Sequence, residues 1–184
     1  IDRVRSVGVS ERASSYLGDT AGVLPGAQVG TVAPPVAVGT RIFAVTSTKG
    51  GTGKTTVAVN LALRLQEHGI RTLLMGFDVP DDTGIHLGLR RAPNSLTYFR
   101  RPSRESFGQS LQQKGELTVC LSPNDLVEAS RIAQRGPDEE GSIASLVDTA
   151  ARHHPPYAAI VMDLPPTETE WSIQPLLRCN TVLL

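Results

Sequence analysis

One stretch of the sequence constrains the fold more than any other: an apolar run, a glycine-rich loop and a helical pattern follow one another without a gap. The run IFAVTS, residues 42–47, contains β-branched and aromatic side chains and predicts a short strand. After the loop, apolar residues recur at helical spacing until Gly69 provides a stop. These apolar residues are Ala58, Leu61, Ala62 and Leu65. The order of strand, loop and helix is typical of phosphate-binding α/β proteins.

The loop itself, within TKGGTGKTT, nearly matches the Walker A phosphate-binding motif, G-x-x-x-x-G-K followed by Ser or Thr. Gly53, Lys54 and Thr55 fill the last three positions, whereas Thr48 stands at the first glycine position. The motif chemistry predicts that Lys54 contacts the β and γ phosphates and that Thr55 is a magnesium ligand. Backbone amides of residues 50–56 would line the phosphate cradle. The predicted nucleotide-binding residues are Gly50, Gly51, Thr52, Gly53, Lys54, Thr55 and Thr56.

Further apolar runs and helical patterns alternate along the rest of the chain. The predicted strands are residues 72–77, 117–122, 158–163 and 181–184, and the later predicted helices are 126–135 and 142–154. Strands alternating with helices give right-handed crossovers, and hence a mainly parallel twisted sheet with helices on both faces. The predicted fold class is therefore α/β, of the P-loop NTPase type. Because a buried strand is an unusual place for a chain to end, we expect a C-terminally truncated domain.

Composition divides the chain of 184 residues into two parts. Residues 1–40 are rich in Gly, Ala, Val and Pro without a helical period, which favours a linker or an extended N-terminal arm. Residues 41–184 contain the alternating pattern and predict a single P-loop ATPase domain, incomplete at its C-terminus.

Charge and cysteine content limit the classes of partner. Eighteen Lys and Arg balance eighteen Asp and Glu, so net charge does not support nucleic-acid binding, and any such contact would have to be local. The two cysteines, Cys120 and Cys179, have no metal-ligand spacing, which favours a reducing cytoplasm and disfavours a metal-cluster reductase. No apolar run reaches the roughly 18 residues of a transmembrane segment.

The segment KGGTGKTT, residues 49–56, resembles the deviant Walker A motif of the ParA/MinD superfamily, in which an additional lysine precedes the glycines. The resemblance implies that Lys49 is the signature lysine, which reaches across an ATP-sandwich homodimer to the phosphates bound by the other subunit. A lysine from a partner would neutralise developing phosphate charge and so couple catalysis to dimerisation. The alternative for Lys49 is a solvated charge beside the loop.

Two carboxylates follow predicted strands, at the edge of the sheet where open α/β folds bind ligands. Asp163, after YAAIVM, fits a Walker B acid that holds magnesium through water; the alternative is a capping residue before a Pro-Pro turn. Asp78 follows the second predicted strand and resembles the second acid of the superfamily's D-x-D segment, which implies that it orients the attacking water. Gly76 stands at the first acid position, so the resemblance implies slow hydrolysis.

Alternatives remain for the acids after the second predicted strand. Asp78 could be a strand-end turn former, and Asp81 and Asp82 are expected in a solvated loop or a helix cap. A basic stretch nearby, around NSLTYF, is expected to be a solvated surface, although it could contact nucleic acid, lipid or protein. Its residues are Arg90, Arg91, Arg100, Arg101 and Arg104.

Residues 40–184 also resemble the CpaE/TadZ branch of the superfamily, which serves pilus assembly. The resemblance lies in GELTVCLSPNDLVEAS, in YAAIVMDLPPTETEW and in the final CNTVLL. It implies pilus or secretion-system partners, and a cytoplasmic protein that partners recruit to the membrane or cell pole. It also makes residues 1–40 an interdomain linker.

The leading functional hypothesis is an ATP-dependent dimerisation switch with weak magnesium-dependent ATP hydrolysis, which positions or organises a pilus or secretion assembly. Its cofactors would be ATP and Mg²⁺. One alternative is a DNA-partitioning or division-site ATPase. The other is a nucleotide-binding scaffold in which hydrolysis has lapsed. A related tyrosine kinase is disfavoured because the chain has only three tyrosines and no terminal tyrosine cluster.

Overall fold

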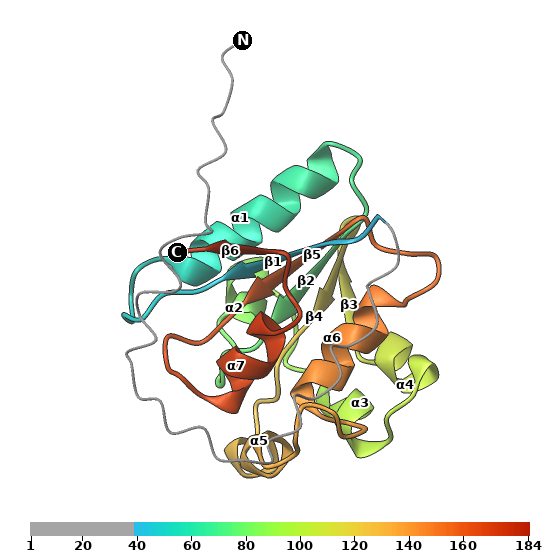
Figure 1. The fold of residues 1–184 in the computed structure, drawn as a ribbon. Coiled ribbons are helices and arrows are strands. Elements are labelled where there is room, and N and C mark those ends of the chain that lie inside the picture. The colour runs from blue at the N-terminus through green and yellow to red at the C-terminus, as the bar shows by residue number, and fades with distance from the viewer. Residues whose placement is uncertain (1–38) are drawn as a thin grey trace, which may run out of the picture. The chain divides into compact units, whose positions relative to one another are not determined.

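A six-stranded sheet forms the centre of the molecule in a computed structural model that describes residues 39–184 (Figure 1). The expected linker, residues 1–40, lies outside the described residues except for Gly39 and Thr40. Thr40 already packs on the domain, since its buried hydroxyl donates a hydrogen bond to the Tyr157 carbonyl at 2.8 Å. None of the helices within residues 39–184 is long and apolar enough to cross a membrane.

The predicted strands are present in the structure, with ends that differ by one or two residues. The strands are β1 Arg41–Val45, β2 Thr72–Gly76, β3 Leu111–Lys114, β4 Leu117–Cys120, β5 Ala159–Asp163 and β6 Thr181–Leu183. The helices are α1 Lys54–Glu67, α2 Thr83–Leu87, α3 Leu96–Arg100, α4 Arg104–Gln109, α5 Leu126–Ala133, α6 Ile143–Ala151 and α7 Glu170–Leu176.

The strand order is β3-β4-β2-β5-β1-β6. All neighbouring pairs are parallel except β3 with β4, so the sheet is mainly parallel, as predicted. The edge strand β3 reads LQQK and was not predicted, because it lacks an apolar run. A tight turn connects β3 to β4. In this turn Gly115 has φ 58°, a conformation that favours glycine. A polar edge strand also discourages pairing with other chains.

Helices cover both faces of the sheet, as the alternating sequence predicts (Figure 1). One face packs against α1 and α2 through a buried cluster that includes Ala58, Ala62, Leu74, Leu87 and Val161. The other face packs against α3 to α7 through a larger cluster. That cluster includes Ile42, Leu73, Met75, Phe99, Phe107, Ile132, Leu146, Ile160 and Trp171. The near-continuous apolar strands therefore reflect burial on both faces.

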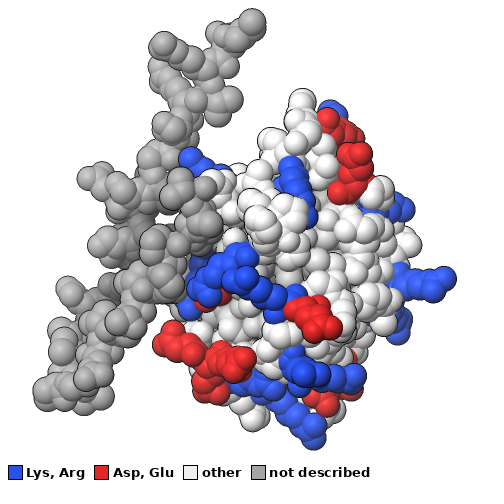
Figure 2. All heavy atoms as spheres, turned by 90° about the vertical axis from the view of Figure 1, so that its right-hand side faces the viewer, with Lys and Arg blue, Asp and Glu red and all other residues white. Residues whose placement is uncertain are grey.

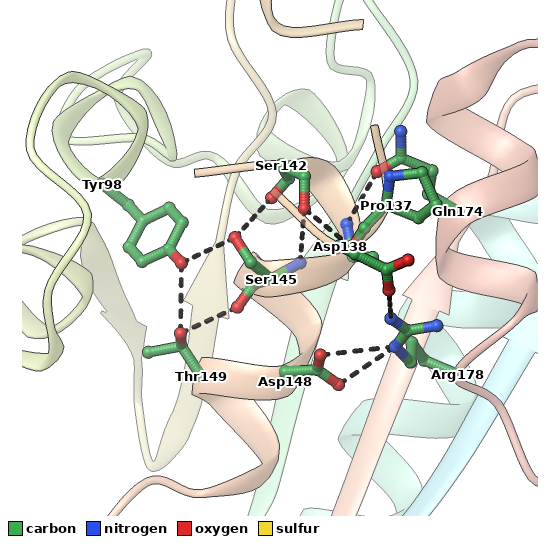
Figure 3. A network of polar contacts seen from close by, with 10 residues as sticks. Tyr98, Pro137, Asp138, Ser142, Ser145, Asp148, Thr149, Gln174 and Arg178 are labelled. Carbon is green, nitrogen blue, oxygen red and sulfur yellow. Dashed lines mark hydrogen bonds and ion pairs between the residues drawn. The ribbon is translucent and has the colours of Figure 1, made fainter. Parts of the chain in front are cut away.

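Polar side chains join α6 to its neighbours α3 and α7 (Figure 3). The Tyr98 hydroxyl lies 2.9 Å from the Ser145 hydroxyl and 3.2 Å from that of Thr149. On the other side of α6, Arg178, two residues beyond the end of α7, donates to Asp148 at 3.2 Å, and only 12% of its side chain is exposed. Because these groups are largely buried and paired, they fix how the helices of this layer sit on the sheet.

Candidate phosphate-binding site

The glycine-rich loop lies between β1 and α1, at the carboxyl edge of the sheet. Gly51 and Gly53 have φ angles of 72° and 86°, which fall in the left-handed region that side chains disfavour. Gly53 is the residue directly before α1. These two glycines therefore let the chain turn from the strand into the helix within a few residues.

The first turn of α1 has no side-chain cap. Gly53 supplies no capping group, and no acidic residue stands in the first turn. The backbone amides at the start of a helix lack intrahelical partners, and the helix dipole adds partial positive charge there. Residues 50–53 are exposed, and Lys54 and Thr55 are partly exposed. The helix therefore presents an open, electropositive end that suits a phosphate group.

Hydrogen bonds within the loop fix its shape. The Ser47 hydroxyl donates to the Lys49 carbonyl at 2.8 Å and lies 2.7 Å from the Thr52 hydroxyl. Sequence reasoning gave no role to Ser47, and no motif position signals it. The Lys49 side chain is exposed at the rim of the loop, and none of the ion pairs among residues 39–184 involves it.

Asp163 ends β5 and is almost fully buried, with 1% of its surface exposed. Its Oδ2 accepts a hydrogen bond from the Thr83 hydroxyl at 3.1 Å, whereas its buried Oδ1 has no partner among the described residues. Burial raises the pKa of Asp163, while the nearby Thr55 hydroxyl, the hydrogen bond from Thr83 and the charge of Lys54 lower it; Thr55 is not within hydrogen-bond geometry of Oδ1. A buried carboxylate oxygen without a partner is costly, so this atom suits a hydrated cation.

Asp78 lies just beyond β2 and is partly exposed. Burial raises its pKa, while the charge of Lys54 lowers it. Asp78 also raises the pKa of Asp163, so the two carboxylates and Lys54 are close enough to interact electrostatically. Lys54, Thr55 and Asp78 all affect the pKa of Asp163, so these four predicted residues lie near one another, and Lys49 is exposed.

Asp81 does not lie in a solvated loop, so that expectation is wrong, but the alternative of a helix cap fits, because its carboxylate accepts from an amide in the first turn of α2. Only 7% of Asp81 is exposed, and its carboxylate accepts hydrogen bonds from the backbone amides of Ser122 at 2.6 Å and Gly84 at 3.3 Å. Burial raises the pKa of Asp81 to about 6, against the lowering effect of those amides. Asp81 turns inward because Gly76 leaves room beside it: a Cβ at position 76 would lie 2.8 Å from Asp81 Oδ2. Asp82, in contrast, is exposed.

Two further residues of the site, Thr83 and Ser122, were not found from the sequence. Thr83 contacts Asp163, and the Ser122 hydroxyl donates to the Asp78 carbonyl. Both residues act through contacts 80 and 44 positions away in the chain, so no local pattern signals them.

A family model described as an AAA domain matches residues 40–184, and the chain belongs to this family. Its relatives place it within the ParA/MinD superfamily, as the glycine-rich loop indicates. The chromosome partitioning protein ParA from Myxococcus xanthus is 28% identical over 154 residues, which cover 78% of this chain and 51% of that protein. The chain thus spans about half the length of this relative.

Solved structures support the same fold. Cobyrinic acid a,c-diamide synthase from Mycobacterium smegmatis, with a bound ATP analogue and magnesium, gives a TM-score of 0.65 at 23% identity. The match covers 78% of this chain and 57% of that one. The septum site-determining protein MinD from Pyrococcus horikoshii, in complex with Mg-ADP, gives a TM-score of 0.62 at 21% identity, covering 78% and 56%. The predicted α/β P-loop NTPase fold is therefore confirmed.

Proposed function

We propose that the protein is an ATP-dependent dimerisation switch that hydrolyses ATP slowly in the presence of Mg²⁺. The observation that carries this proposal is the buried, unpartnered Oδ1 of Asp163, which shares a site with Thr55 and Lys54 at the uncapped end of α1. An open helix end suits phosphate, and a carboxylate oxygen beside a threonine hydroxyl suits hydrated magnesium. Relatives with the same fold support the choice of ATP and magnesium.

Each residue of the site has a distinct role in this proposal. Backbone amides of residues 50–56 bind the phosphates, Lys54 pairs with the β and γ phosphates, and Thr55 and Asp163 hold magnesium, Asp163 through water. Magnesium held by these two residues would offset the negative charge of the phosphates. Asp78 accepts a hydrogen bond from water and orients it toward the γ phosphate. The raised pKa of Asp78 suits a group that accepts a proton.

Lys49 would complete the site of a second copy of the chain. Lys49 is exposed, and it takes part in none of the ion pairs among residues 39–184. The deviant Walker A pattern supports a role in trans, in which Lys49 offsets charge on phosphates bound by the partner. ATP binding would then favour the dimer, and hydrolysis would release it.

Steady-state ATPase assays combined with light scattering test the switch. Lys49→Ala should lower turnover at least about 10-fold and keep the protein monomeric with ATP and Mg²⁺. Asp78→Ala should lower turnover to a similar extent but still dimerise. Lys114→Ala, at an exposed lysine on the edge strand β3, is the matched control and should behave as wild type. Equal background rates in all four proteins would instead favour the hydrolysis-deficient scaffold.

For the biological role, we favour positioning or organising a pilus or secretion assembly, with residues 1–40 as a linker and action in the cytoplasm through partners at the membrane. The resemblance to the CpaE/TadZ branch supports this role.

The similarity to ParA supports DNA partitioning as the second candidate. On the face shown in Figure 2, basic and acidic side chains are interspersed, which does not favour DNA there. ATP-dependent DNA binding that weakens with salt would favour partitioning.

A further inference from the structure

The end of β2 lies directly beside the end of β5. Gly76 and Asp163 are register partners in these parallel strands, so a side chain at position 76 would project on the same side of the sheet as the Asp163 carboxylate. That space is occupied. A Cβ at position 76 would lie 2.8 and 3.1 Å from the Asp81 carboxylate oxygens and 3.1 Å from the Thr83 hydroxyl. Asp81, from the following loop, and Thr83, the first residue of α2, therefore fill the place beside Asp163.

Asp81 is fixed in this place by the backbone. Its carboxylate accepts from the amide of Gly84, at the start of α2, and from the amide of Ser122, just after β4. The Ser122 hydroxyl in turn holds the Asp78 carbonyl. Asp81 and Ser122 thus tie both ends of the loop between β2 and α2 to the neighbouring strand.

Thr83 connects this loop to Asp163. Its hydroxyl donates to Asp163 Oδ2 at 3.1 Å, and it also lies near the Asp81 carboxylate, whose pKa it lowers. Thr83 itself is 1% exposed, so it has little freedom to choose another rotamer. With Oδ2 engaged, the Asp163 carboxylate is held in one orientation, and the buried Oδ1 is the oxygen left for another partner.

We propose that Thr83 is a positioning residue for Asp163, and that Asp81 holds Thr83 in the space that a side chain at Gly76 would otherwise occupy. This inference rests on the proposed function, which gives Asp163 its role in magnesium binding. Asp81, in the loop after β2, and Thr83, at the start of α2, therefore supply the polar groups beside Asp163 that Gly76 lacks. Loss of the Thr83 hydroxyl frees the Asp163 carboxylate to rotate, and an oriented ligand binds its metal more tightly than a mobile one.

The test compares Thr83→Val with Thr83→Ser in calorimetric ATP titrations, performed with EDTA and at several Mg²⁺ concentrations. Valine replaces the hydroxyl with a methyl group and should raise the Mg²⁺ concentration for half-maximal effect about 10-fold, with ATP affinity in EDTA unchanged. Serine keeps the hydroxyl and should restore most of the wild-type response. Thr97→Val, on α3 and outside the site, is the matched control.

Asp81→Asn provides a second test that does not alter Thr83, and it should shift the Mg²⁺ response in the same direction as Thr83→Val. Loss of ATP affinity in EDTA to the same extent as in Mg²⁺ would show a merely structural role and overturn the inference. A magnesium response in wild type that both Thr83→Val and Asp81→Asn leave unchanged would overturn it while leaving the proposed function intact. If Mg²⁺ does not increase the ATP affinity of wild type, both this inference and the proposed function are overturned.

Discussion

At the end of β2, the space beside Gly76 is filled by the buried side chain of Asp81 and has no room for a second side chain. The Asp81 carboxylate lies where a Cβ on Gly76 would be, 2.8 Å from its Oδ2, and two backbone amides hold it there. Because real Cβ atoms do not approach that closely, a side chain at position 76 must displace Asp81 from its hydrogen bonds. The two positions are therefore coupled energetically.

A double-mutant cycle measures this coupling. Gly76→Ala should lower the free energy of unfolding by about 1–3 kcal/mol, because the new methyl group overlaps a buried carboxylate. In the Asp81→Ala background the same change should cost less, since the overlap with Asp81 is gone. Urea denaturation provides the four values. Gly108→Ala, where an added Cβ has open space, is the control for a plain glycine substitution. Additive effects at positions 76 and 81 would contradict the shared space.

The raised pKa of Asp81 makes stability depend on pH. The folded pKa is about 6, above the roughly 3.9 of an unfolded aspartate. The folded protein holds the proton on Asp81 more tightly than the unfolded chain does. This contribution to stability is fully present below pH 4 and is lost as the pH rises through 6. Between pH 4.5 and 7, wild type should therefore lose about 2 kcal/mol relative to Asp81→Asn, which has no charge to bury.

Urea denaturation of both proteins without nucleotide, at pH 4.5 and pH 7, gives this difference directly. Asp78 and Asp163 also have raised pKa values, but they are present in both proteins and largely cancel in the comparison. Parallel pH profiles for wild type and Asp81→Asn would show that Asp81 is not buried as a charge in the folded protein.

At the scale of elements, the glycine-rich loop between β1 and α1 requires a backbone conformation that other residues disfavour, whereas the space around these glycines is open. Gly53→Ala should lower the free energy of unfolding by about 1–2 kcal/mol, because φ 86° is unfavourable for alanine. It should also weaken ATP binding, since the amides at the start of α1 would shift. Gly50→Ala is the matched control: position 50 has no positive φ and open space around its Cβ, so stability should change little. Equal losses in both variants, seen by thermal denaturation, would exclude this explanation.

Elements with a strong local signal could be predicted, and the others could not. Strands β2, β4 and β5 are continuous apolar runs because both faces of the sheet are covered, and this pattern is visible in the sequence. Strand β3 is polar and exists through its pairing with β4. Helices α2, α3 and α4 have only five or six residues, too few to show a helical period.

The same distinction applies to the site. The glycine-rich loop and the acids that follow strands are local features, so their positions at the carboxyl edge could be predicted. The inward turn of Asp81 and the contact of Thr83 with Asp163 depend on packing between distant segments. Two adjacent aspartates after a strand predict a solvated turn. Asp81 turns inward only because Gly76 has no side chain in the space that its carboxylate fills.

At the scale of the whole molecule, the proposed switch links stability to both ATP and protein concentration. A ligand that binds only the folded state stabilises it by about 2.7 kcal/mol at 100 times its Kd. ATP with Mg²⁺ should therefore raise the melting temperature of wild type. If ATP also joins two chains, that melting temperature should rise further as protein concentration increases, because the dimer unfolds to separate chains.

Two lysine variants separate these contributions in thermal denaturation at several protein concentrations. Lys54→Ala should lose the response to ATP altogether, because Lys54 pairs with phosphates in its own site. Lys49→Ala should keep the ATP response but lose its dependence on protein concentration, because Lys49 acts on the partner's phosphates. Lys114→Ala should match wild type in both respects. A melting temperature of wild type with ATP and Mg²⁺ that is independent of protein concentration would leave ATP binding in place and contradict dimerisation, since mass action requires that dependence.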